Sequence, residues 1–366
     1  YKMPSHHRKT MLAIEHCRTA VMGTRVDICD ACGHVRSTYN SCRNRHCPKC
    51  QGLKRELWVE KLSADLLPVQ YFHIVFTMPS ELNRLALVNQ ECIYDILFSA
   101  ASQTILSLAK DKKHLGVATG LIAVLHTWGQ NLMDHPHLHT LVPAGGLDTM
   151  HSYWKDSSKK FFIHVKVLSQ VFKGKFLALL KEAYATNQLK FEGAIKPLTL
   201  KKNFKQLLDI VYQKPWVVYS KSSFKNSSQI IHYLGRYSHR IAISNSRIVG
   251  IESDQVLFKW KDYADYNRHK TMKLQGVEFI RRFMLHVLPK GFCKIRYFGI
   301  FASRNRKTLL PLCRMAMQHK VVKSKIIGLS WQEQVAIVTG VELWVCPKCK
   351  TGKMIFYERI KYIAPP

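Results

Sequence analysis

The chain has 366 residues, 47% of them hydrophobic, which is enough for two or three domains with packed cores. Its 56 Lys and Arg against 24 Asp and Glu give a formal net charge of +32, spread along the chain. Such a charge favours a polyanionic partner, nucleic acid before an anionic membrane surface, and fits poorly with a hydrolase of small molecules. No apolar run approaches about 18 residues, so we expect no membrane span.

The first region, residues 1–65, is predicted to be a zinc-binding domain that resembles a zinc ribbon. Cys29-x2-Cys32 and Cys47-x2-Cys50 are separated by fourteen residues, a spacing typical of four thiolates around one Zn2+ in a reducing compartment. Cys42 and His46, within SCRNRHCPKC, could replace one of these ligands or help to bind a second ion. The opening residues, YKMPSHHRK, have no signal-peptide pattern, and we expect further residues upstream.

The next region, residues 66–250, is predicted to be the core of an α+β fold with a central antiparallel sheet. Hydrophobic periodicity and turn residues indicate the following elements: helix at 53–67, strand at 71–79, helix at 81–110, strands at 121–130 and 137–145 joined by a turn at NLMDHP, mainly helix over 150–210, and helix at 222–240.

The last region, residues 251–366, is predicted to be basic and to end in a CxxC knuckle. Strands are expected at 241–251 and 256–264, followed by an amphipathic helix at 276–288 that Pro289 and Gly291 end. The CPKC at 346–349 supplies two ligands, so it predicts half of another zinc site, with Cys313 or His319 as completions. The alternative is a turn with two free thiols.

The hairpin in HTWGQNLMDHPHLHTLVPAGG, residues 126–146, carries the clearest chemical pattern. His137 and His139 are two apart on a strand, so their imidazoles project from one face and could hold a divalent ion. The register decides whether Gln130 or His126 supplies a third ligand. Unrelated metallo-hydrolases also use this pattern, but they usually add several carboxylates as ligands. The segment 121–147 contains only one acidic residue, Asp134, in the turn. The other alternative is a packed histidine pair.

Two tyrosines in IIHYLGRYSHR could supply nucleophiles. Tyr233 and Tyr237 are four apart, so on a helix both phenols lie on one face. A phenol, with a pKa near about 10, forms a phosphoester that a sugar hydroxyl can reverse, which suits transfer better than hydrolysis. The alternative is that both tyrosines belong to the apolar face of a helix and pack in the core. We expect His135, Arg236 and Arg240 to contact DNA.

Four segments together resemble the transposases of the insertion sequence 91 family, in the family's order: SCRNRHCPKCQ, HTWGQNL with HPHLH, YLGRYSHRIAISN, and GVEFIRRFMLHVLPKGFCKIRYFG. The resemblance implies an HUH endonuclease, named for histidine–hydrophobic–histidine, here His137-Leu138-His139. It implies Mg2+ or Mn2+ at these histidines, structural Zn2+, and Tyr233 and Tyr237 as nucleophiles that cut single-stranded DNA through 5′-phosphotyrosine in rolling-circle transposition.

The same resemblance implies single-stranded transposon ends and targets as partners, in the bacterial cytoplasm at the nucleoid. Because the chain lacks a GxxxxGK[ST] phosphate loop, any helicase would come from the host. Two other readings remain. A zinc-ribbon nucleic-acid-binding protein without catalysis leaves HPHLH without a role, and a transposase with three catalytic carboxylates conflicts with the acid-poor centre.

Overall fold

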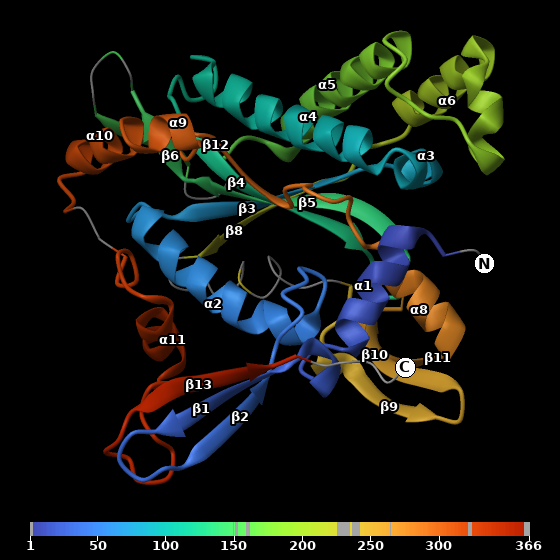
Figure 1. Cartoon of the computed structure of the whole chain (residues 1–366). Helices are drawn as coiled ribbons and strands as arrows, with labels where there is room; N and C mark the ends of the chain where they lie inside the picture. Colours follow the sequence, from blue (N-terminus) through green and yellow to red (C-terminus); the bar gives the residue numbers. More distant parts are fainter. Residues whose placement is uncertain are drawn as a thin grey trace. The chain divides into compact units, whose positions relative to one another are not determined.

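The structure is a computed structural model, shown in Figure 1, that divides into two compact units described separately below. The central unit comprises residues 65–233 and 247–322, and the terminal unit comprises 1–64, 234–246 and 323–366. The predicted division into 1–65, 66–250 and 251–366 stays a prediction. The residues described are 3–148, 150, 153–158, 162–224, 235, 242–263, 265–320 and 324–361.

A five-stranded antiparallel sheet forms the frame of the central unit. Each pair of neighbouring strands is antiparallel, in agreement with the expected α+β fold built on a central antiparallel sheet. The order of the strands is β12 (Ile295–Gly299), β4 (Gly120–Trp128), β5 (Asp134–Pro143), β3 (Tyr71–Thr77) and β8 (Val218–Phe224).

One face of this sheet is covered by α4 (Gln90–Lys110) and α5 (Val165–Ala185), as Figure 1 shows. Successive side chains of a strand point to opposite faces, so Phe72 and Phe76 of β3 and Leu138 of β5 enter the apolar core beneath the helices. The intervening residues of the same strands therefore project from the opposite face. By length and composition α4 could cross a membrane, but two thirds of that stretch is buried in this core.

The remaining elements of the central unit extend this frame. A second sheet has the order β11-β10-β9, and β6 pairs with β7. The bounds are η2 Ser80–Leu82, α3 Asn83–Val88, β6 Gly145–Leu147, β7 Trp154–Asp156, η3 Gly193–Thr199, α6 Lys201–Gln213, η4 Asn245–Arg247, β9 Ile248–Glu252, β10 Gln255–Asp262, β11 Arg268–Gln275, α8 Gly276–Leu285, α9 Ser303–Arg306 and α10 Leu309–Ala316.

The terminal unit joins the two ends of the chain in one three-stranded sheet, β13-β1-β2. A capping box at Ser330 and Glu333 begins α11, and left-handed Gly340 ends it. The bounds are α1 Ser5–Glu15, η1 Ala20–Met22, β1 Thr24–Cys29, β2 Val35–Tyr39, α2 Pro48–Asp65, α11 Trp331–Thr339 and β13 Met354–Ile360.

Most expected elements are present with shifted ends. The helix expected at 53–67 begins earlier, as α2, and the strand expected at 137–145 begins at Asp134, so the hairpin turn is confined to 129–133. Within the helix expected at 222–240, residues 222–224 instead end strand β8, Gly235 is in helical conformation, and the rest lies outside the described residues.

Candidate metal centres

Three histidines come together on the face of the central sheet opposite α4 and α5. The β4–β5 register sets His126 opposite His137 and Val124 opposite His139, so ring nitrogens of His126, His137 and His139 lie within 4.8 Å of one another. An irregularity between His126 and Trp128 changes the pairing toward the turn, where Trp128 lies opposite Asp134. Of the two candidate third ligands only His126 belongs to this cluster, which we call the histidine cluster.

Gln130 lies beyond the end of β4 and outside the histidine cluster. Its side-chain amide donates to the Tyr263 hydroxyl at 3.4 Å, and its backbone carbonyl accepts from Arg247 at 2.5 Å. In the expected register Gln130 would have faced His137, but β5 begins at Asp134 and pairs with β4 so that His126 faces His137 instead. His135 is exposed, and its contribution to the site is a backbone carbonyl.

The nitrogen atoms of the cluster are arranged as metal ligands. The Nδ1 of His137 lies 2.6 Å from the carbonyl oxygen of His135, so it must carry a proton and donate, which leaves a lone pair on Nε2. The Nε2 atoms of His137 and His139 are 3.0 Å apart. Two ligands at right angles, each about 2.1 Å from an ion, are separated by about 3.0 Å. The residues present therefore fit a bound cation.

His73, on β3, is a site residue that the sequence did not reveal. Its Nε2 lies 2.8 Å from Nδ1 of His139, and the two rings are stacked. If His139 offers Nε2 to an ion, its Nδ1 carries the proton and donates to His73. A ligand's second nitrogen is commonly held in this way, and the partner fixes the ring and its tautomer. A histidine within a predicted strand was the only available signal.

The surroundings keep these imidazoles neutral. Burial lowers the pKa of His137 to about 4 and lowers that of His139 well below its ordinary value. His126 stacks on Trp128 with 4.7 Å between ring centroids, and Lys294 lies 4.9 Å above the Trp128 ring. Neutral rings with cationic neighbours can accept an ion and still attract an anionic ligand.

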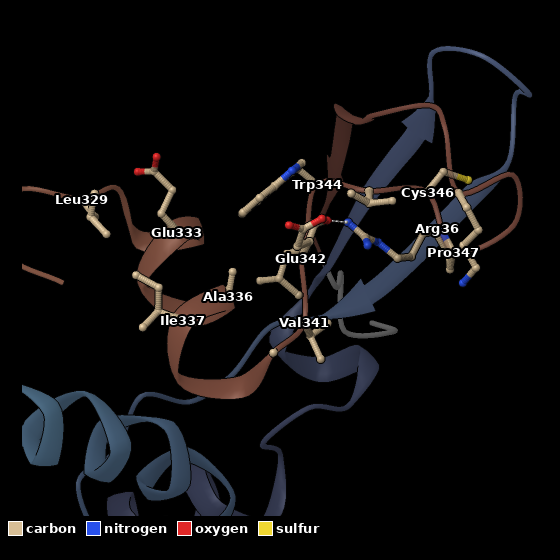
Figure 2. A pocket seen from close by; sticks show the side chains of 14 residues that line it. Arg36, Leu329, Glu333, Ala336, Ile337, Val341, Glu342, Trp344, Cys346 and Pro347 are labelled. Atoms are coloured by element: carbon tan, nitrogen blue, oxygen red, sulfur yellow. Dashed lines mark hydrogen bonds between the residues drawn. The ribbon is translucent and has the colours of Figure 1, made fainter. Parts of the chain in front are cut away.

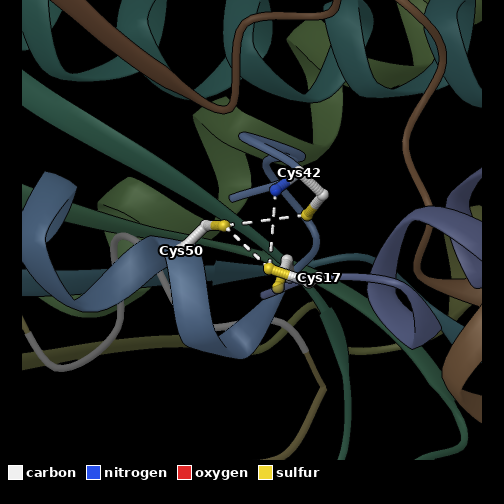
Figure 3. A group of neighbouring side chains, drawn as sticks. Cys17, Cys42 and Cys50 are labelled. Atoms are coloured by element: carbon white, nitrogen blue, oxygen red, sulfur yellow. Dashed lines mark hydrogen bonds between the residues drawn. The ribbon is translucent and has the colours of Figure 1, made fainter. Parts of the chain in front are cut away.

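The first cysteine cluster consists of Cys17, Cys42, Cys47 and Cys50, whose sulfurs lie within 4.8 Å of one another. Figure 3 shows three of them, with Cys50 Sγ at 3.5 Å from Cys17 and 3.6 Å from Cys42. Tetrahedral Zn2+ with bonds of about 2.3 Å sets its sulfurs about 3.8 Å apart, so this cluster suits zinc. The Cys42 backbone N–H also donates to Cys17 Sγ.

The second cysteine cluster consists of Cys29, Cys32, Cys346 and Cys349. The predicted set of Cys29, Cys32, Cys47 and Cys50 around one ion is therefore wrong, because the two CxxC pairs belong to different clusters. Cys42 replaces no ligand but is a full member of the first cluster, together with the unpredicted Cys17. The completions proposed for CPKC are also wrong, because Cys29 and Cys32 occupy that role.

Three other expected ligands lie elsewhere. His46 is buried, and its backbone N–H and Nδ1 both contact Asn44 Oδ1, at 2.8 and 3.2 Å. Cys313 is buried on α10, and Nδ1 of His319 contacts the carbonyl of Lys320 at 2.9 Å. None of the three belongs to a cluster of potential ligands among the described residues.

The tyrosine segment is described at one position only. Tyr233, Tyr237, Arg236 and Arg240 all lie outside the described residues. Gly235, midway between the tyrosines, is buried, and a Cβ added there would lie 2.8 Å from Cγ2 of Val59 on α2. The absence of a side chain at Gly235 therefore allows its backbone to approach α2 closely.

Comparison with known proteins identifies the family. A family model described as "Putative transposase" matches residues 120–308, and one described as "Transposase zinc-binding domain" matches residues 1–78. A Sinorhizobium fredii protein named "Putative transposase y4qJ" is 43% identical over 361 residues, covering 98% of this chain and 91% of the relative.

A second relative is the "Transposase for insertion sequence element IS801" of Pseudomonas savastanoi pv. phaseolicola. It is 28% identical over 309 residues, which cover 83% of this chain and 72% of the relative. No solved structure matches. The matched zinc-binding region contains the whole first cysteine cluster, and the matched transposase region contains the histidine cluster. The chain belongs to the transposases of the insertion sequence 91 family.

Proposed function

We propose that this transposase nicks and rejoins single-stranded DNA through 5′-phosphotyrosine, with the histidine cluster as its ion site and Tyr233 and Tyr237 as nucleophiles. The observation that carries the proposal is the approach of the His137 and His139 Nε2 atoms to 3.0 Å, with each opposite nitrogen already engaged. With His139 in the tautomer that donates from Nδ1 to His73, both Nε2 lone pairs are directed at one point, and they repel each other unless a cation lies between them.

The donor set indicates which ion suits the site. Three neutral imidazoles carry no formal negative charge, so they do not neutralise a bound divalent ion. Its full positive charge is then available to attract a phosphate. Imidazole suits transition metals better than it suits Mg2+, and of the two expected ions we therefore favour Mn2+. When bound, such an ion polarises the scissile phosphate as a Lewis acid.

The protein's own residues would hold the DNA strand against this site. Lys221 pairs with His73 across β3 and β8, and it acts electrostatically on that ring, as Lys294 does on His139. Two ammonium groups beside a site without a ligating carboxylate favour a phosphodiester over a neutral substrate. Exposed His135, beside the cluster, is placed to contact the flanking strand.

The tyrosines would exchange one phosphoester for another. A phenolic oxygen attacks phosphorus, the bond from phosphorus to the 3′ oxygen breaks, and the phenolic proton ends on the 3′ hydroxyl. A different 3′ hydroxyl reverses the exchange and joins two strands without ATP. The second tyrosine lets a second strand be cut before the first is released, and unwinding would then fall to a host helicase.

A denaturing gel tests the proposal. Wild-type protein with Mn2+ and a labelled single-stranded transposon end should give a covalent protein–DNA adduct. Tyr233→Phe and Tyr237→Phe should each still nick once but lose complete strand transfer, and the double variant should give no adduct while binding DNA. Tyr212→Phe, at an exposed tyrosine on α6, is the matched control.

Mass spectrometry of the trapped peptide identifies the nucleophile. If only one tyrosine ever carries the nucleotide, the two-tyrosine assignment is wrong and the protein is a one-tyrosine enzyme. The absence of any adduct from wild-type protein that binds single strands with Mn2+ would instead favour the alternative, a zinc-containing nucleic-acid-binding protein without catalysis.

A further inference from the structure

The second cysteine cluster draws its four sulfurs from the two ends of the chain. Cys29 Sγ lies 3.7 Å from Cys349 Sγ, and Cys32 Sγ lies 3.8 Å from Cys346 Sγ. These separations match the edge of about 3.8 Å expected for a zinc–sulfur tetrahedron and greatly exceed a disulfide bond of about 2.05 Å. All four residues belong to the terminal unit.

The two halves of this cluster have the same backbone design. In each, the carbonyl of the first cysteine accepts a 3.1 Å hydrogen bond from the residue four positions later, Gly33 or Lys350. Both of these residues are left-handed, with φ of +67° and +64°. This turn lets backbone N–H groups donate to sulfur: Cys32 donates to Cys29 Sγ and Lys348 to Cys346 Sγ. Such bonds stabilise thiolates, the form that binds metal.

The backbone brings the two halves together. Strand β13 pairs with β1 from Thr24↔Ile360 to Cys29↔Met354. Beyond this pairing, Asp30 and Lys353 exchange two bonds, Asp30 N–H to the Lys353 carbonyl at 3.1 Å and Lys353 N–H to Asp30 Oδ1 at 2.7 Å. Arg36 of β2 donates to the Leu343 carbonyl at 3.0 Å, and both residues line the cavity of about 850 Å³ in Figure 2.

The hydrophobic core among the described residues does not explain this association. The buried cluster at the junction consists of Cys29, Cys346 and Met354, with Cys349 partly buried. Along β13, Ile355, Phe356 and Tyr357 are each more than half exposed. A segment with so little buried apolar surface needs another source of stability, and a structural metal is a common one.

We propose that Cys29, Cys32, Cys346 and Cys349 bind a second structural Zn2+, which fastens the C-terminal strand to the N-terminal zinc-binding domain. The matched family zinc-binding region ends at residue 78, so it holds half of this site. The domain is then completed only by the last part of the chain. This inference does not depend on the nicking reaction proposed above.

Metal analysis of the purified full chain tests the proposal. The wild-type protein should contain two tightly held zinc ions. Cys346→Ser and Cys349→Ser should each leave one, Cys42→Ser should also leave one, and the matched control Cys313→Ser, at a buried cysteine outside both clusters, should leave two. Unchanged zinc content in both Cys346→Ser and Cys349→Ser would overturn the proposal, as would iron in place of zinc.

A pair of glycine variants tests the geometry with every cysteine retained. A Cβ at Gly352 would lie 2.4 Å from Cys29 Sγ, whereas a Cβ at Gly52 on α2 would meet nothing within 4 Å. After Co2+ replaces zinc, Gly352→Ala should lose about half of the sulfur-to-cobalt absorption, while Gly52→Ala should keep all of it. Equal absorption in the two variants would contradict a site closed by the C-terminal knuckle.

Discussion

The histidine cluster and the second cysteine cluster are assembled in opposite ways. His126, His137 and His139 lie on the two strands of one hairpin, and a third strand, β3, supplies His73, so a hydrogen-bonded sheet over a large core fixes all four before any ion binds. The cysteines join segments 314 residues apart, and among the described residues the buried cluster between them is small. If both sites bind metal as proposed, the sheet holds the first set of ligands in place without an ion, whereas the second set needs its ion to hold two distant segments together.

Removal of zinc should give the largest effect and the sharpest separation between the two regions. A structural zinc site contributes on the order of 10 kcal/mol, so a strong chelator should abolish protection of backbone amides from hydrogen exchange in β1, β2 and β13. Amides of β3, β4 and β5 should remain protected. Loss of protection in both sheets at the same chelator concentration would break the comparison.

Loss of a histidine ligand should stop the reaction and leave the fold intact. His137→Ala removes one of the two facing Nε2 atoms, and we expect nicking to fall by about 10³-fold because a metal contributes several kcal/mol. Single-strand binding, which relies on distributed basic charge, should persist and fall steeply with salt. His114→Ala, at an exposed histidine after α4, is the control. Cleavage that survives EDTA would contradict the assignment.

Loss of the positioning histidine should give an intermediate effect. His73→Leu removes the acceptor for Nδ1 of His139, so the ring loses its fixed tautomer, and we expect Mn2+ affinity to fall about 10- to 100-fold. His73→Gln offers an oxygen acceptor and should recover part of that loss. Calorimetric titration with Mn2+ measures both; equal affinities in wild type and His73→Leu would show that His73 only packs.

The smallest expected effect concerns the other face of β5. Burial raises the pKa of Asp134 to about 7, and neither carboxylate oxygen has a hydrogen-bond partner within the described part of the chain. The folded state therefore holds a proton that the unfolded state loses above about pH 4. Stability should fall as pH rises from about 4 to 7 and then level off.

Asp134→Asn tests this directly. Asn cannot ionise, so its stability relative to wild type should increase between pH 4 and pH 8, by about 1 kcal/mol after allowance for water reaching the site. Urea unfolding midpoints at both pH values measure the change. A difference that does not vary with pH would place the carboxylate in a wetter environment.

Local sequence patterns predicted the pairs of ligands that lie close together in the sequence. The two-residue period of a strand brings His137 and His139 together, and CxxC pairs indicate zinc wherever they occur. Register was beyond prediction, because the residue at which β5 begins, Asp134 instead of His137, decides which residue of β4 faces His137. His73 was missed because its role arises on another strand.

The cysteine partners could not be predicted for a different reason. Any two CxxC pairs that meet can form a tetrahedral site, so the spacing of Cys29, Cys32, Cys47 and Cys50 suggested one ion without establishing it. Long-range pairing between strands β1 and β13 decides which cysteines meet, and no local sequence pattern predicts that pairing. Cys17, with no neighbouring cysteine, gave no signal.

The pairing of β1 with β13 also orders events on the ribosome. The first cysteine cluster spans 33 residues and can close as soon as Cys50 emerges. Cys29 and Cys32 must wait for residues made 314 positions later, roughly 15 to 60 s at ordinary rates of synthesis. A nascent chain, or one that ends before Cys346, therefore carries an open pair of thiols at Cys29 and Cys32 and would lack the second zinc.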